Sequence, residues 1–151
     1  MSFNFKYKPV VLKRGSKIYR PLIPITINGK EAFDALAVLD SGSDITILPK
    51  EIAEELGVDF KGDNEISGIG GSPLKAKEGK INITFGKGIE IYRFDIPVLV
   101  PTEKENLSLI IGRLGFFNQF RITFDESQKR IEFKKSPDII GGYLAVREDS
   151  E

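Results

Sequence analysis

The stretch VLDSGSDITILP, Val38 to Pro49, determines how the rest of the sequence is interpreted. An apolar run leads into Asp40 and Asp44, which are separated by Ser-Gly-Ser, and a second apolar run follows at once. A buried strand that ends in Asp-Ser-Gly presents a carboxylate at its end, with backbone N–H groups and hydroxyls around it. Asp, Ser and Gly are also the commonest turn residues, so a plain turn is the alternative for this segment alone.

The composition limits the chemistry that the chain can perform. Its 151 residues include 22 basic and 22 acidic side chains, so no net charge attracts nucleic acid or anionic lipid. Cysteine and histidine are absent, which excludes disulfides, thiolate or imidazole metal sites, and Ser-His or Cys-His relays. An enzyme of this composition must use carboxylates, lysines or hydroxyls. We therefore expect no metal, no cofactor, no nucleic-acid partner and no membrane partner.

Alternating apolar and polar residues predict a mostly β chain. Alternation over Ile23–Ile27 gives a first strand, Asn28-Gly29 is the pair favoured in a tight primed turn, and EAFDALAVLD returns as a second strand that ends at Asp40. The further predicted strands are Lys75–Phe85, Ile89–Val100, Leu107–Ile111, Phe120–Phe124 and Arg130–Phe133. Short strands at regular spacing are typical of a barrel or a sandwich.

Two short helices are expected between the strands, within one domain. Pro49 in the first turn opens KEIAEEL and Gly57 ends it, and a shorter helix follows Gly112. The length predicts a single domain over 1–151, with a core of about 17–135 and with an N-terminal strand and a C-terminal tail as extensions. No run resembles a signal peptide or a membrane span, so the expected location is cytoplasmic.

Four ordered segments resemble the retropepsin-like aspartic proteases, the single-domain family of the retroviral proteases. LDSGSDIT, Leu39–Thr46, is similar to the family's hydrophobic-Asp-Thr/Ser-Gly-Ala/Ser-Asp-x-Thr signature. RPLIPITINGKEA from Arg20 resembles the strand pair before the catalytic Asp, GIGG from Gly68 resembles the flap tip, and LIIGRLGF from Leu109 resembles the Gly-Arg segment before a short helix. The resemblance implies an all-β, closed acid-protease barrel with one or two short helices that dimerises, and a peptide or protein substrate.

The resemblance also implies a catalytic group that one chain leaves incomplete. Peptide hydrolysis in this class uses two carboxylates about 3 Å apart that share one proton, so that one acts as base toward a water while the other donates. Asp40 supplies one carboxylate, and no other Asp in the sequence is followed by Ser/Thr-Gly. We therefore expect an aspartic endopeptidase that is a homodimer, in which Asp40 of the partner subunit completes the pair across a twofold axis.

Other residues would support this pair, by the same resemblance. Ser41 would hydrogen-bond across the dimer, and the Gly42 backbone would approach closely because no Cβ is in the way. A Ser43 hydroxyl that donates to the pair would favour its ionised form and shift the pH optimum toward acid relative to a Ser43→Ala variant.

The resemblance further implies a brace beneath the loop and a flap above it. Asp44 would pair with Arg113, and Arg20 would reach Asp44 of the partner subunit. The flap residues that would close over an extended peptide are Gly68, Ile69, Gly70 and Gly71.

Several alternatives stay open at this point. Arg20 and Arg113 can be ordinary surface charges, and the glycine run a flexible turn. Ser72-Pro-Leu-Lys75 fits the S-x-x-K pattern of serine-lysine hydrolases, which requires a helix where a strand is expected. The same fold also serves a catalytically inactive peptide-binding or dimerisation module. The retroviral chains are shorter at both ends: this sequence has an additional segment before Arg20 and a long tail after the Gly-Arg segment. The sheet by which the retroviral chains dimerise therefore cannot be assumed for this chain.

Overall fold

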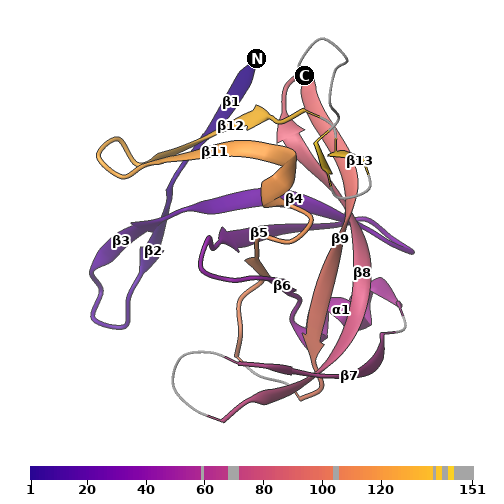
Figure 1. Cartoon of the computed structure of the whole chain (residues 1–151). Coiled ribbons are helices and arrows are strands. Elements are labelled where there is room, and N and C mark those ends of the chain that lie inside the picture. The colour runs from indigo at the N-terminus through magenta and orange to yellow at the C-terminus, as the bar shows by residue number, and fades with distance from the viewer. Residues whose placement is uncertain (59, 68–71, 104–105, 138, 141–142, 145–151) are drawn as a thin grey trace.

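The fold is mostly β, as the sequence predicts. The computed structural model describes residues 1–58, 60–67, 72–103, 106–137, 139–140 and 143–144 (Figure 1). Its strands are β1 (Ser2–Lys6), β2 (Lys8–Val11), β3 (Lys17–Arg20), β4 (Leu22–Asn28), β5 (Phe33–Leu39), β6 (Thr46–Ile47), β7 (Lys61–Ile66), β8 (Leu74–Lys87), β9 (Glu90–Pro101), β10 (Ile110–Ile111), β11 (Phe120–Asp125), β12 (Arg130–Lys135), β13 (Ile139–Ile140) and β14 (Tyr143–Leu144). An α-helix, α1 (Lys50–Leu56), and a 3₁₀ helix, η1 (Phe117–Gln119), lie between strands.

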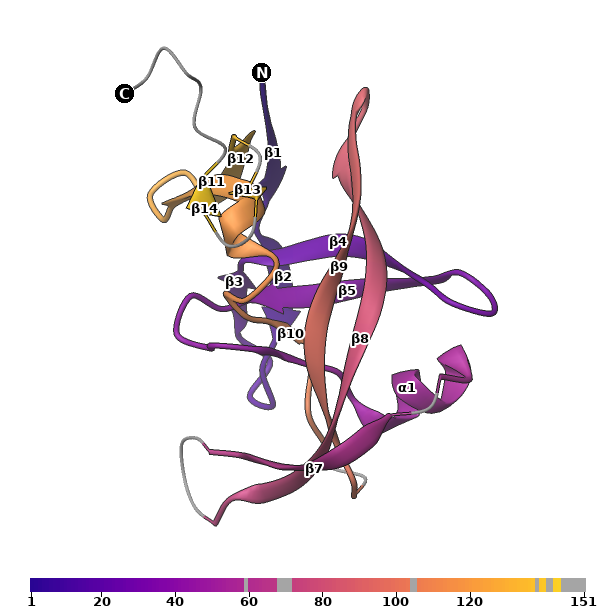
Figure 2. The ribbon, with the colours of Figure 1, turned by 45° about the vertical axis from the view of Figure 1, so that its right-hand side comes forward.

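Six of these strands close into a barrel, which decides between the two predicted architectures. The order around the barrel is β4-β5-β10-β6-β9-β8, and β8 pairs again with β4. The β5–β10 and β6–β9 pairs are parallel and the others antiparallel. The long ribbon of β8 and β9 crosses the molecule, and β7 extends the sheet beside β8 (Figures 1 and 2).

The predicted hairpin turn at Asn28-Gly29 is wrong. Strand β4 runs through Asn28, β5 begins only at Phe33, and Gly29 does not have the positive φ that a primed turn requires. The reason is a tertiary contact: a Cβ on Gly29 would lie 3.1 Å from Cδ2 of Leu56, so this glycine lets the connection pass close to α1. The prediction at Leu107–Ile111 is also too long, since only Ile110 and Ile111 form a strand.

Helix α1 agrees with the prediction at its carboxyl end. Gly57 has φ 65° and ψ 26°, and its N–H donates to the Glu54 carbonyl at 3.1 Å, so a left-handed glycine ends the helix. Pro49 lies one position earlier than predicted, as the N-cap with an extended ψ of 143°. The expected shorter helix after Gly112 is the 3₁₀ turn η1. Within the described ranges, no helix has the length and hydropathy that crossing a bilayer requires.

The core continues from the barrel into a second, three-stranded sheet. Strand β1 pairs with β12, and β12 pairs with β11, above one end of the barrel (Figure 1). Phe3 and Phe133 from this sheet pack on Phe85 from β8, and the Phe85 and Phe133 ring centroids lie 4.8 Å apart at 75°. Because Phe3 belongs to the same buried cluster as the barrel residues, the N-terminal strand is part of the core rather than an addition to it.

Candidate active site

Asp40 follows directly on the last residue of β5, at the rim of the barrel. Ala37 and Leu39 of β5 are buried, whereas the Asp40 side chain is half-buried. The Asp40 N–H donates to the Ile111 carbonyl at 3.0 Å, and its Oδ1 accepts the Gly42 N–H at 2.8 Å. The loop backbone therefore holds the carboxylate in one orientation and leaves its other oxygen available.

Strand β10 holds both ends of the Asp40 loop. It pairs in parallel with β5, through Val38–Ile110, and antiparallel with β6, through Ile110–Ile47. The loop from Asp40 to Ile45 therefore connects β5 to β6, the two strands that pair with β10 on either side. A segment about seventy residues further along the chain fixes the distance between the two ends of the loop.

Gly112 and Thr46 make this close packing possible. A Cβ on Gly112 would lie 2.5 Å from both C and O of Ile45, so no other residue fits without moving backbone. Thr46 is fully buried, and its Oγ1 accepts the Gly112 N–H at 3.1 Å, which satisfies both groups. Thr46 lies in LDSGSDIT and Gly112 in LIIGRLGF, but sequence reasoning assigns neither residue a role of its own. Two features of the sequence could have identified them. One is a glycine that directly follows two isoleucines, and the other is a threonine that the apolar alternation places on the inner face of a strand.

Arg113 and Asp44 form an ion pair on the outer side of the loop. The backbone joins the same two segments, because Arg113 N–H donates to the Ser43 carbonyl at 2.8 Å and Leu114 N–H to the Asp44 carbonyl at 2.9 Å. The side chains of Asp44 and Arg113 are 76% and 55% exposed, so the pair adds about 0–1 kcal/mol to stability. Their contact is the one that the resemblance implied, and its effect on catalysis stays a prediction.

Ser43 does not make the hydrogen bond that the sequence suggested. Its Oγ donates to the Ile45 carbonyl at 2.8 Å, so its proton is engaged within the loop and not with Asp40. The physical reason is the tight loop, which brings a backbone acceptor two residues on within reach of a short hydroxyl side chain. The expected acid shift of the pH optimum therefore loses its basis. Ser41 is exposed next to Asp40, and its contact across a dimer stays a prediction.

Other predicted site residues lie at different places. Arg20 is exposed at the end of β3, and the next residue, Pro21, accepts the Leu39 N–H at 3.1 Å, so Arg20 lies close to the start of the Asp40 loop. The flap residues, 68–71, lie outside the described residues. Lys75 is on strand β8 and not on a helix, so the S-x-x-K pattern lacks the geometry of a serine-lysine hydrolase.

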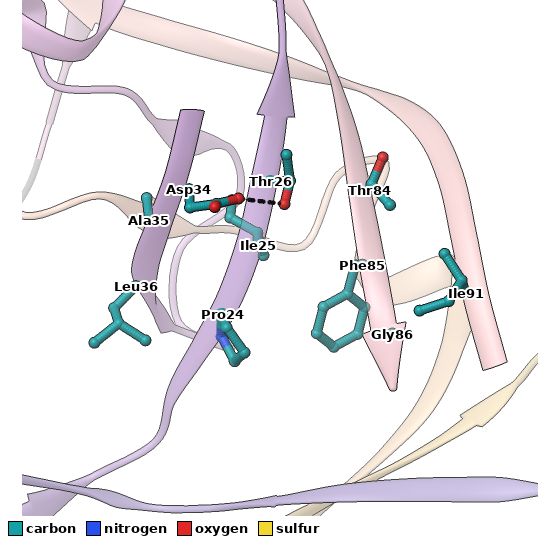
Figure 3. Close-up of a pocket in the computed structure, with 10 residues that line it drawn as sticks. All are labelled: Pro24, Ile25, Thr26, Asp34, Ala35, Leu36, Thr84, Phe85, Gly86 and Ile91. Carbon is teal, nitrogen blue, oxygen red and sulfur yellow. Dashed lines mark hydrogen bonds between the residues drawn. The ribbon is translucent and has the colours of Figure 1, made fainter. Parts of the chain in front are cut away.

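A surface cavity of about 490 Å³ lies elsewhere on the barrel (Figure 3). Strands β4, β5, β8 and β9 line it, with Pro24, Leu36 and Ile91 as its exposed apolar part. Its one carboxylate, Asp34, accepts the Thr26 hydroxyl at 2.7 Å, which the dashed line in Figure 3 marks. Asp40 is not among its lining residues, so we do not assign the reaction to it. Nor do three or more metal-ligating side chains gather anywhere in the part of the chain that the structure describes.

A closed mixed barrel that carries Asp-Ser-Gly on a loop, held by β10 and the Gly-Arg pair that follows it, defines the class of acid-protease folds. The family profile described as aspartyl protease matches residues 23–114, and the chain belongs to this family. Among solved structures, the chain is similar to a retropepsin-like aspartic protease from Rickettsia conorii, at 17% identity and a TM-score of 0.59. That match covers 88% of this chain and 89% of the other, and it shows the retropepsin-like fold. No curated protein matches the sequence.

Proposed function

We propose that the chain is an aspartic endopeptidase that hydrolyses extended peptides as a homodimer. Asp40 and Asp40 of the partner subunit share one proton; the ionised carboxylate removes a proton from water, and the other protonates the peptide carbonyl. The aspartyl protease family and the retropepsin-like fold support this proposal. The observation that carries it is the orientation of the half-buried Asp40 carboxylate by the Gly42 N–H, at the end of a buried strand.

The remaining residues take supporting roles in the proposal. Ser41 holds the two loops together across the dimer, and Ser43 keeps the shape of its own loop. The pair of Asp44 and Arg113 braces the loop, while Arg20 reaches toward the partner subunit. The flap is the segment at 68–71. The proposal includes one domain over 1–151 and no metal or cofactor, and the cytoplasmic location stays a prediction.

The test is cleavage of a peptide library at acid and neutral pH by the wild type and by Asp40→Asn. The isosteric Asn keeps the shape of the loop but cannot act as a base, so we expect cleavage to vanish while the thermal unfolding curve is retained. Ser72→Ala is the matched control, because it removes the hydroxyl of the rival S-x-x-K pattern. Cleavage that survives Asp40→Asn would sink the proposal.

A mixing experiment tests whether the two carboxylates come from two chains. If only dimers with two intact Asp40 residues are active, random exchange with an equal amount of Asp40→Asn lowers the activity per wild-type chain to about half. If each Asp40 acts alone, the activity per wild-type chain stays constant. The oligomeric mass of the wild type is measured in the same buffer, so that the activity can be compared with the fraction of dimer.

The second candidate is an inactive peptide-binding or dimerisation module on the same fold. Its support is that a single chain carries one Asp-Ser-Gly carboxylate. It predicts peptide binding that is equal for the wild type and Asp40→Asn, with no cleavage by either protein.

A further inference from the structure

The hairpin of β2 and β3 carries exposed apolar residues, among them Val11 and Tyr19. Its two strands pair only with each other, and their register joins Pro9 to Tyr19 and Val11 to Lys17. Two-stranded sheets that pack on nothing are marginally stable in water. A hairpin of two strands therefore depends on the surfaces that its two faces contact.

The hairpin has one half-buried face and one exposed face, which we call the outward face. Val10 and Ile18, which pair with each other, are half-buried, whereas the alternate positions are exposed. On the outward face Val11 is 64% exposed and Tyr19 is 50% exposed. This face has the composition of an interface centre, in which aliphatic and aromatic side chains are surrounded by charged ones.

The position of the hairpin relative to Asp40 limits what can cover this face. The chain passes from β3 into β4 at Pro21, whose carbonyl accepts the N–H of Leu39, the residue before Asp40. In both ribbon views the hairpin lies beside the loop that joins β5 to β6 (Figures 1 and 2). If a second Asp40 approaches the first to about 3 Å, as the shared proton requires, the body of the second chain must lie on this side of the molecule. A hairpin that starts next to Asp40 then lies along that second chain.

The charges of the chain are divided in a way that favours the same contact. The first thirty residues contain no Asp or Glu, although the whole chain is neutral, so the rest of the chain carries the excess of carboxylates. The basic residues of this segment are Lys6, Lys8, Lys13, Arg14, Lys17, Arg20 and Lys30. In a twofold dimer, each basic hairpin faces the more acidic body of the other copy, and the attraction counts twice.

We propose that the β2–β3 hairpin is a dimerisation arm that packs its outward face, Pro9, Val11 and Tyr19, on the body of a second copy of this chain. This inference rests on the proposed function, because the second Asp40 places the partner. Strand β1 already pairs with β12 of its own chain, so we assign the contact with the second copy to the hairpin and not to that strand. A polyanion is the other occupant that a basic hairpin suggests, but it would use the cations and leave the apolar face uncovered.

The first test is Val11→Ser/Tyr19→Ser, and Ile89→Ser/Ile91→Ser is the matched control. Ile89 is in the turn before β9 and Ile91 is at the start of β9, and they are 88% and 53% exposed. Sedimentation over a dilution series gives the dimer dissociation constant, and circular dichroism verifies folding. We expect the arm variant to raise the dissociation constant about a hundredfold and the control to leave it unchanged. Cleavage at high enzyme concentration should return to the wild-type kcat, because the arm holds no reacting group.

The second test uses charge and does not remove apolar side chains, so it avoids loss of the hairpin itself. Lys13→Glu/Lys17→Glu is compared with Arg121→Glu/Lys134→Glu, an exposed pair on β11 and β12. We expect the arm variant to raise the dissociation constant about tenfold at low salt and the difference to shrink at high salt. To test the polyanion as the other occupant, a labelled single-stranded oligonucleotide is titrated into each protein.

The outcomes separate the arm from the proposed function. A dimer of unchanged affinity and full activity in both arm variants overturns the arm and leaves the endopeptidase proposal intact. The arm is also overturned if the control variant at Ile89 and Ile91 dissociates the dimer and the arm variant does not. It is overturned as well if the Lys13 and Lys17 variant loses oligonucleotide binding while the mass of the dimer stays unchanged. A wild type that stays monomeric at every concentration overturns both proposals, and activity in Asp40→Asn overturns the function alone.

Discussion

Gly112→Ala tests the packing that holds the Asp40 loop. The added Cβ would lie 2.5 Å from C and O of Ile45 and 2.8 Å from its N, and all three are backbone atoms that cannot rotate away. Nonbonded carbon atoms rest at about 3.5–4.0 Å, so β10 and the loop must separate by about 1 Å. A shift of this size lengthens three hydrogen bonds between the two segments beyond a useful distance.

The cost follows from those three bonds. They run from Gly112 N–H to Thr46 Oγ1 at 3.1 Å, from Arg113 N–H to the Ser43 carbonyl at 2.8 Å and from Leu114 N–H to the Asp44 carbonyl at 2.9 Å. At about 0.5–1.5 kcal/mol each, with a further penalty of about 1–3 kcal/mol where the buried threonine loses its partner, the sum is about 2.5–7.5 kcal/mol. For a chain of this size that lowers Tm by about 5–30 °C.

The assay is urea unfolding of Gly112→Ala beside Gly29→Ala. At Gly29 the nearest atom to a new Cβ is a side-chain methyl of Leu56 at 3.1 Å, which can rotate, so we expect a loss below about 1.5 kcal/mol. If Gly112→Ala unfolds within about 1 kcal/mol of the wild type, the close approach of the two segments is not a determinant of stability, and our account of how the loop is held is incorrect.

Three further predictions concern single polar side chains. Asp44→Asn should change the free energy of unfolding by no more than about 1 kcal/mol, because the ion pair is exposed, but should lower kcat/KM at least tenfold if the brace positions the loop; an unchanged kcat/KM refutes the brace. Ser43→Ala should leave the pH–rate profile unchanged and cost about 1 kcal/mol in thermal unfolding, since its hydroxyl donates to a backbone carbonyl. The Gln128 N–H and the Ser127 hydroxyl hold the pKa of Asp125 below its ordinary value of 3.8, so the stability that this carboxylate adds is complete above pH 3.8 and is lost as the pH falls through the lower folded value. Carboxyl NMR titration of Ser127→Ala should show the pKa of Asp125 rising toward 3.8, and an unmoved titration curve contradicts this cause.

Local patterns predicted the elements whose information lies within one stretch of sequence. Helix α1 ends at Gly57 as predicted because a left-handed glycine acts within one turn. Strands β8 and β9 agree with their alternation, since a long amphipathic ribbon repeats its signal many times. The spacing of the strands allows a barrel or a sandwich, and the resemblance in four ordered motifs selects the barrel, which the pairing of β8 with β4 closes.

The elements that the sequence missed depend on distant partners. Strands β6 and β10 have two residues each, too few for any period, and they exist because each is flanked by strands from elsewhere in the chain. Asn28-Gly29 carries a strong local signal for a two-residue turn, but the contact of Gly29 with Leu56 decides the outcome. In the same way, the hydrogen-bond acceptor of the Ser43 hydroxyl is decided by the geometry of the loop, which β10 imposes, and not by the residue type.

These long-range contacts bear on how a dimer would become active. Three backbone bonds that shape the Asp40 loop are formed by the single chain: Asp40 N–H to Ile111, Arg113 N–H to Ser43 and Leu114 N–H to Asp44. A loop that is formed in the single chain needs no reorganisation when a second copy binds, so association loses less conformational freedom than it would with a loop that orders at the interface. Under the proposed function, activity should therefore follow the concentration of dimer directly after dilution or mixing, with no slower phase after the mass has reached its final value. A lag in cleavage that outlasts dimer formation would show that the partner remodels the loop.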